Sequence, residues 1–260
     1  KKVVFLKKLK INKYDWLGFH FSSHFFGRKM KVSILFVFFS TIFTLSCNNS
    51  FEYALNQNFL PTTKKSAIDG KEMVLVTAGE FIMGTNKVDS DNSHLKMGTV
   101  KPLFLDQHPI RRISLDSYYI DKYEVTNEEY KLFLDSSGYD ELPGHWENGT
   151  FLDGENQYPV THVTWREALT YALWAQKLLP TEAQWEKAAR GEDGRMFPWG
   201  NNYEKGKGNI DIDGAKKIMK VGSYPTDISP YNIYDLAGNV MEWTMDWYLP
   251  YPGSTFVSPR

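Results

Sequence analysis

The strongest constraint on the fold is a local helix-start signal that occurs three times, in which a Thr is followed three residues later by Glu or Gln. In this capping box the Thr oxygen accepts a hydrogen bond from a free backbone N–H group, and the Glu or Gln side chain reaches back to the Thr N–H group. The three pairs are Thr126 with Glu129, Thr164 with Glu167, and Thr181 with Gln184. Each pair predicts the start of a short helix.

Gly and Pro predict where these helices end. The first should run from about 127 to 135 and stop near Gly138, and the third should end at Gly191, because Gly readily adopts the left-handed conformation that closes a helix. The second must end before Pro180. Apolar residues at helical spacing predict the buried faces of the second and third helices. They are Trp165, Ala168, Leu169, Ala172 and Leu173 in the second, and Trp185, Ala188 and Ala189 in the third.

Alternating apolar residues predict strands before the first helix. Residues 73–76 (MVLV) are strand-like, Gly79 marks a turn, and Phe81 and Met83 resume the alternation, which together predict a hairpin. Residues 112–120 predict a further strand, and the polar segment 89–106 is expected to be a long loop.

Regular structure is expected to thin out after the third helix. Gly, Pro, Asn and Asp recur every few residues from Gly191 to Pro230. A loop-rich stretch inside a compact domain needs something to hold it, and oxygen-rich loops commonly fold around bound cations. We therefore expect metal ions to support this part of the chain.

Composition narrows the classes of partner. The formal net charge is −1, so neither a basic nor an acidic excess indicates a nucleic-acid partner or an attraction to a membrane surface. Aromatic residues make up 15% of the chain, which excludes a low-aromatic disordered protein for the aromatic-rich part after residue 118. The only cysteine is Cys47, so the chain can form no intramolecular disulfide and no cysteine-based metal site.

The region around Cys47 is typical of an export signal. Met30-Lys31 is followed by an apolar run from 32 to 45 and then by Ser46-Cys47. This order predicts a signal peptide over residues 30–46, because the apolar run is too short to cross a bilayer as a helix. The cysteine that follows resembles a bacterial lipoprotein processing site, at which Cys47 would carry the lipid anchor. Thr44 departs from the usual Leu, so an ordinary signal peptide or an uncleaved anchor with a chance cysteine is the alternative.

The remaining N-terminal segments are expected to lie outside the domain. Residues 1–29 predict an upstream extension, in which His20 and His24 have the i, i+4 spacing of a helical metal pair but lack a third ligand. Residues 47–70 are polar and predict a tether. The domain is expected over 71–260, on a protein attached to the bacterial cell envelope at the outer membrane or cell surface.

Six strings occur in an order that resembles the formylglycine-generating enzyme family, also called the sulfatase-modifying factor family. They are 80–84 (EFIMG), 124–130 (EVTNEEY), 159–165 (PVTHVTW), 179–191 (LPTEAQWEKAARG), 198–200 (PWG) and 234–243 (YDLAGNVMEW). The resemblance covers about 73 to 260. It implies an α+β fold, a single mixed and loop-rich domain with partial similarity to C-type lectin-like folds.

The resemblance also implies structural calcium. One site would use the Asp235 carboxylate, the Gly238 and Val240 carbonyl groups and the Glu242 carboxylate. Two carboxylates around a Gly-containing turn, with carbonyl groups at alternate positions, suit calcium chemically. A second site would begin with Asn209 and the Ile210 carbonyl group, with Asp213 as a candidate for its distal carboxylate.

Two departures from the family pattern bear on activity. Leu178 stands where the family usually has Arg before the LPTE string. The chain also stops at Arg260, before the closing segments that carry the family's copper-binding cysteine pair, so we expect the domain to be C-terminally incomplete. No catalytic residue can be assigned. His162 and His108 are expected to be structural.

Three functions therefore stay open. The first is a calcium-stabilised binding or assembly module for a protein or glycan ligand, anchored to the membrane by lipid. The second is an oxidase that converts a sulfatase cysteine to formylglycine, if further sequence supplies the copper-binding cysteines. The third is a truncated product that does not fold. The absence of any cysteine between Asn48 and Arg260 favours the first.

Overall fold

The structure is a computed structural model, and it describes residues 9–11, 60–90, 104–210 and 217–255. The expected signal peptide, the expected lipidation site Cys47 and nearly all of the upstream extension lie outside these residues, as does Asp213. Within the described residues, no helix is long and apolar enough to cross a membrane.

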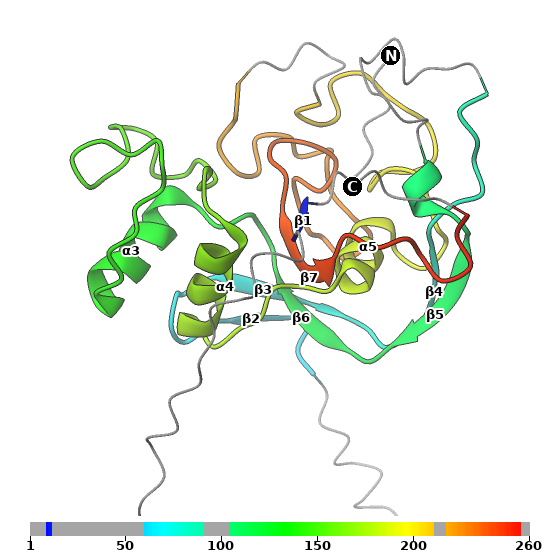
Figure 1. Cartoon of the computed structure of the whole chain (residues 1–260), viewed down its shortest axis with the longest axis horizontal. Coiled ribbons are helices and arrows are strands. Elements are labelled where there is room, and N and C mark those ends of the chain that lie inside the picture. Colours follow the sequence, from blue (N-terminus) through cyan, green and yellow to red (C-terminus); the bar gives the residue numbers. More distant parts are fainter. Residues whose placement is uncertain (1–8, 12–59, 91–103, 211–216, 256–260) are drawn as a thin grey trace, which may run out of the picture. The chain divides into compact units, whose positions relative to one another are not determined.

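Two small antiparallel sheets occupy the first half of the domain (Figure 1). In one, β3 (Glu72–Val76) lies between β2 (Thr63–Lys65) and β6 (Tyr118–Asp121). In the other, β4 (Gly79–Met83) pairs with β5 (Arg111–Leu115). The strand β2 falls within the segment expected as a tether, so the folded domain includes residues before 71.

The predicted hairpin between 73–76 and 81–83 is wrong. Val74 of β3 pairs with Ile120 of β6, and Phe81 of β4 pairs with Ile113 of β5. After β4 the next strand along the chain, β5, therefore pairs antiparallel with β4, and the strand after it, β6, pairs antiparallel with β3. The single strand expected over 112–120 is two strands, interrupted at residues 116–117. Alternation indicates that a segment is extended, but it does not identify the partner strand.

All three capping boxes are confirmed. They begin α3 (Asn127–Ser137), α4 (Trp165–Trp174) and α5 (Glu182–Arg190), and in each the Thr side chain accepts from the backbone N–H group three residues later. Gly138 closes α3 in the left-handed conformation. The helices α3 and α4 lie side by side, and α5 lies beside β4 and β7 (Trp243–Trp247) (Figure 1).

The expected buried stripe of α4 is only partly correct. Tyr171 and Ala172 are buried, whereas Leu173 is 56% exposed. Tyr171 packs against Tyr130 and Phe133 of α3, with ring centroids 5.8 and 5.7 Å apart. The bulkier aromatic contacts rotate the helix so that its buried face centres on Tyr171 and not on the aliphatic residues.

The predicted face of α5 is confirmed. Trp185, Ala188 and Ala189 are buried against Val74 and Val76 of β3. The small alanines allow the helix to approach the strand closely, while the indole fills the space beside them. This contact forms one core of the domain and places one end of α5 beside the later loops.

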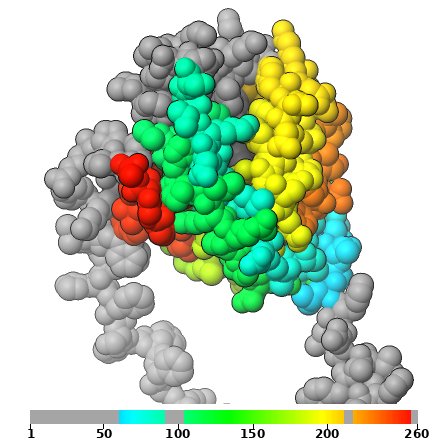
Figure 2. All heavy atoms as spheres, turned by 90° about the vertical axis from the view of Figure 1, so that its right-hand side faces the viewer, coloured from blue at the N-terminus to red at the C-terminus, as the bar shows by residue number. Residues whose placement is uncertain are grey.

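The part after α5 has little regular structure, as expected. Its one strand among the described residues is β7, which pairs in parallel with β1 (Leu9–Ile11). Figure 2 shows the loop after α5, coloured yellow, beside the cyan and green chain of the first sheets. The approach is close, because a Cβ atom added at Gly194 would lie 2.8 Å from Ile82 of β4.

Candidate functional site

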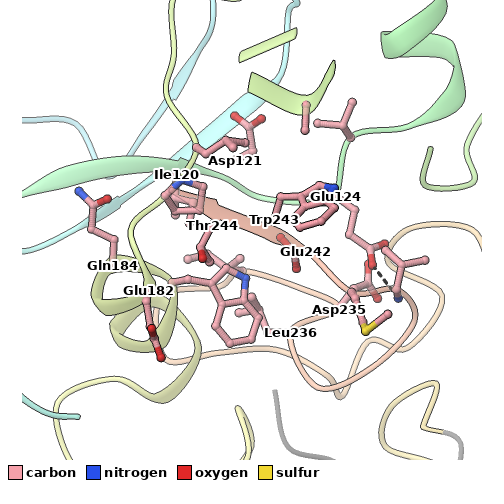
Figure 3. A pocket seen from close by; sticks show the side chains of 18 of the residues that line it. Ile120, Asp121, Glu124, Glu182, Gln184, Asp235, Leu236, Glu242, Trp243 and Thr244 are labelled. Atoms are coloured by element: carbon pink, nitrogen blue, oxygen red, sulfur yellow. Dashed lines mark hydrogen bonds between the residues drawn. The ribbon is translucent and has the colours of Figure 1, made fainter. Parts of the chain in front are cut away.

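A cavity of about 1510 Å³ lies where β6, α5 and the segment 233–245 meet. Figure 3 shows Glu124 and Asp235 on one side of it, Glu182 and Gln184 on the other, and Glu242 between them. The string 234–243 therefore lines the cavity, as do both Asn209 and Ile210. The residues that the sequence nominated for metal binding are gathered in one region.

Four carboxylates belong to this region: Glu124, Asp227, Asp235 and Glu242. Glu124, Asp227 and Asp235 are buried. No salt bridge joins any of the four to a Lys or Arg among the residues that the structure describes. Buried negative charge without a paired cation is unfavourable, so this arrangement favours either protonation or a bound cation.

The pKa values of all four carboxyl groups are raised, so their charged forms are disfavoured. Burial, followed by the charges of Asp235 and Glu242, raises the pKa of Asp227 to about 7. Burial, followed by the charges of Glu242 and Asp235, holds the pKa of Glu124 well above its usual range. The carboxylates thus disfavour one another's charge, and one cation among them would relieve several at once.

Glu242 differs from the other three in its access to solvent. Protein atoms surround it, and this burial raises its pKa to about 7. Its side chain nevertheless faces the cavity and is only partly shielded. The indole N–H group of Trp185 lies close enough to lower the pKa of Glu242, although the contact falls short of hydrogen-bond geometry. Glu242 is therefore the carboxylate most accessible to a ligand in the cavity.

Backbone and amide groups hold the carboxylates in place. Glu124 accepts from Asn239 Nδ2 at 2.8 Å and from the Val240 N–H group at 3.3 Å. Asp235 accepts from the Gly222 N–H group at 2.6 Å. Asp235 and Asn239 have φ values of 60° and 58°, a left-handed conformation that Asp and Asn adopt more readily than most residues. The tight turn between them brings both ends of the string to the cavity.

The two calcium sites implied by the sequence are not separate in space. The Asn239 N–H group donates to the Asn209 carbonyl group at 3.0 Å, and Asn209 Nδ2 donates to Asn239 Oδ1 at 2.9 Å. A Cβ atom at Gly238 would lie 2.4 Å from the Asn209 carbonyl oxygen. The segment around Asn209 and Ile210 therefore packs directly on the turn that carries Gly238.

The ligands that the sequence nominated share one donor type. All the nominated side chains and carbonyl groups are oxygen donors, which calcium prefers. Among the described residues, no group of three or more His, Cys, Asp or Glu side chains is arranged to hold one ion. The set implied by the sequence contains only two carboxylates, Asp235 and Glu242, so backbone carbonyl groups would have to complete it.

Sequence reasoning missed Glu124 and Asp227 as members of this site. Glu124 opens the string 124–130, but its position before a helix gave no metal-ligand spacing. Asp227 lies in the loop-rich stretch and accepts from the Ala237 N–H group at 3.1 Å. Only the fold brings both carboxylates beside Asp235.

Three residues in the cavity wall have buried polar atoms that make no hydrogen bond within the described part of the chain: the Tyr130 and Thr244 hydroxyl groups and Trp185 Nε1. Of these, Trp185 Nε1 lies near the Glu242 carboxylate. Buried polar groups are rarely left unsatisfied, so the hydroxyl groups favour a cavity that receives polar atoms from water or from a ligand.

Comparisons with known proteins agree with the six strings. Residues 58–258 match the "Sulfatase-modifying factor enzyme 1-like domain". The "Formylglycine-generating enzyme" of Mus musculus is 30% identical over 229 residues, covering 68% of this chain and 58% of that protein. The "Inactive C-alpha-formylglycine-generating enzyme 2" of Bos taurus is 28% identical over 227 residues, covering 68% of this chain and 71% of that protein.

A solved structure supports the same relationship. PvdO from Pseudomonas aeruginosa superimposes with a TM-score of 0.55 at 28% sequence identity, over 71% of this chain and 74% of that chain. The chain spans 58% of the length of its mouse relative. The match over most of the sequence, together with the order of the strings, shows that this chain belongs to the sulfatase-modifying factor family.

Proposed function

We propose that the domain is a calcium-stabilised binding module, exported and held at the bacterial cell envelope by a lipid on Cys47. The observation that carries the proposal is a group of four carboxylates, of which Glu124, Asp227 and Asp235 are buried and Glu242 is partly shielded, with no salt bridge to a Lys or Arg among the described residues. A calcium ion bound through Asp235 and Glu242 would offset this charge and tie the turn at Gly238 to the cavity wall.

The cavity beside the carboxylates suits a polar ligand. Trp185 contributes an aromatic face and an N–H group near Glu242, and Thr244 contributes a hydroxyl group that makes no hydrogen bond within the described residues. A glycan or a protein side chain presents hydroxyl or carbonyl groups that would satisfy both. The expected likeness to C-type lectin-like folds points in the same direction. A family relative whose name marks it as inactive supports a role other than catalysis for some members.

Calcium binding is tested by isothermal titration of the full chain with Ca²⁺. We expect Asp235→Asn and Glu242→Gln each to weaken binding by about tenfold or more, because each removes a charged ligand. Glu80→Gln is the control, since Glu80 is an exposed carboxylate on β4. Unchanged affinity in the double variant would remove calcium from the proposal.

Ligand binding is tested on an array of immobilised glycans with Ca²⁺ and with a chelator. The proposal expects binding that is lost in the chelator. It also expects weaker binding by Trp185→Phe, which keeps an aromatic ring but removes the N–H group. Binding that is equal with and without Ca²⁺ would separate the ligand site from the carboxylates.

The alternative is a formylglycine-generating oxidase. It is favoured by the relationship to the mouse enzyme, and it requires a copper-binding cysteine pair, whereas the sequence contains only Cys47. The test incubates the chain with Cu(I), oxygen and a cysteine-containing sulfatase peptide and measures aldehyde formation by mass spectrometry. Turnover by this chain would replace the binding module as the leading function.

A further inference from the structure

Two histidines lie together at the edge of the cavity. His145 belongs to the loop after α3, and His162 precedes the N-cap residue of α4. Their ring centroids are 5.0 Å apart and the rings are tilted by 43°. Both side chains are exposed, and His162 also lines the cavity. This pair lies outside the carboxylate group described above and has different chemistry.

The ring separation matches that of two imidazoles bound to one ion. At a metal–nitrogen distance of about 2.1 Å and a tetrahedral angle, two imidazole ring centres are about 5 Å apart. The observed separation therefore requires little movement. A direct stack of the two rings would be nearly parallel, whereas these rings are tilted.

Thr161 orients both imidazoles. Its hydroxyl group lies 3.0 Å from His162 Nδ1, and its backbone lies close enough to the His145 ring to raise the pKa of that imidazole. Metal-binding histidines usually have one ring nitrogen held by such a polar partner, which leaves the other nitrogen for the metal. No described residue hydrogen-bonds His162 Nε2. Thr161 therefore lies beside both imidazoles.

The backbone supports the same arrangement. His162 has a φ value of 56°, in the left-handed region that His, Asn and Asp adopt more often than other side chains. The Gly144 N–H group donates to the His162 carbonyl group at 3.4 Å, which joins the loop that carries His145 to the residue before α4. The two rings are therefore positioned from segments that contact one another.

The protonation states also favour a ligand role. Burial and then the charge of His162 lower the pKa of His145, while Glu155 opposes this shift. Neutral imidazole is the form that binds metals, and it predominates at neutral pH for a histidine whose pKa is lowered.

We infer that His145 and His162 form a binding site for a divalent transition-metal ion of the Cu²⁺, Ni²⁺ or Zn²⁺ class. Imidazole nitrogen suits these ions, whereas calcium and magnesium prefer oxygen. The two rings leave the other coordination positions to water or to a ligand that reaches the edge of the cavity. The site is separate from the calcium proposed for Asp235 and Glu242.

The test is a Cu²⁺ titration of the full chain, followed by electron paramagnetic resonance, in excess Ca²⁺ to occupy the carboxylates. We expect nitrogen hyperfine structure from two imidazoles, and at least about tenfold weaker binding in His145→Gln and in His162→Asn. Asn tolerates the left-handed backbone at position 162. Thr161→Val should weaken binding by about tenfold, because the rings lose one of their orienting contacts.

The matched control is a second histidine pair. His20→Gln combined with His24→Gln removes the i, i+4 pair and should leave the two-nitrogen signal unchanged. Circular dichroism without metal should show that all variants keep the wild-type melting temperature. A two-nitrogen signal that survives loss of both His145 and His162, or wild-type binding too weak to detect at millimolar Cu²⁺, would overturn the inference.

Discussion

Replacement of Gly238 by Ala is the sharpest test of the packing between the two segments of the candidate site. The added Cβ atom would lie 2.4 Å from the Asn209 carbonyl oxygen and 2.8 Å from its carbonyl carbon. Both are backbone atoms, so no side-chain rotation can relieve the clash. The two segments must separate by about 1 Å to restore ordinary van der Waals contact.

The free energy of unfolding should fall by about 4 kcal/mol. Overpacking against a rigid neighbour costs about 3 kcal/mol at the upper end of its usual range. Separation also weakens the 3.0 Å hydrogen bond from the Asn239 N–H group to the Asn209 carbonyl group, which contributes about 1 kcal/mol. A loss of this size is a large fraction of the roughly 5–15 kcal/mol that stabilises a typical domain.

Urea unfolding followed by fluorescence measures the effect, with Gly144→Ala as the matched control. Neither Gly238 nor Gly144 has a left-handed φ value. A Cβ atom at Gly144 would meet its nearest neighbour, the His162 Cβ atom, at an ordinary 3.8 Å. The control should therefore change stability by less than about 1 kcal/mol. Equal stabilities for the two variants would show that the turn at Gly238 is not packed against Asn209.

Three further predictions concern charge and capping. The pKa of Asp227 is raised to about 7, so its contribution to stability is present below about pH 4 and is lost as the pH rises to about 7. In a chelator at pH 8, Asp227→Asn should therefore stabilise the protein by up to about 4 kcal/mol. Equal urea midpoints for the wild type and the variant at pH 8 would contradict this prediction. Thr126→Ala removes the cap of α3 and should lower the melting temperature by roughly 3 °C in calorimetry, through a loss of about 1 kcal/mol; an unchanged melting temperature would count against the cap. Lys187→Met should lower the free energy of unfolding by about 3 kcal/mol, measured in urea. The reason is that the buried ammonium group donates to the Thr77 and Gly79 carbonyl groups at 2.7 and 2.9 Å. A loss below about 1 kcal/mol would show that these contacts contribute little to stability.

Helix positions could be predicted from the sequence because their signals are local. The boxes at Thr126, Thr164 and Thr181 act through residues only three positions away, and Gly138 and Gly191 act on the adjacent turn. Strand pairing could not be predicted in the same way. Val74 pairs with Ile120 and Phe81 pairs with Ile113, and alternation carries no information about which later segment supplies the partner.

The candidate site was predictable in part. Asp235, Gly238 and Glu242 stand in one string whose resemblance to a family was specific, and the structure places all three in the wall of the cavity that Asn209 also lines. Glu124 could not be predicted, because it joins the site only through hydrogen bonds to Asn239 and Val240, more than a hundred residues later. Long-range pairs of this kind depend on the whole fold.

The ammonium group of Lys187 has a consequence for the order of folding events. It bonds carbonyl groups 110 and 108 residues earlier in the chain, at the break between β3 and β4. Contacts between such distant residues close a long loop and are slow to form. We expect the two sheets to pair before α5 docks, so that Lys187 adds little to the transition state. Its loss should then speed unfolding more than it slows folding, which makes this one side chain a determinant of the lifetime of the native state.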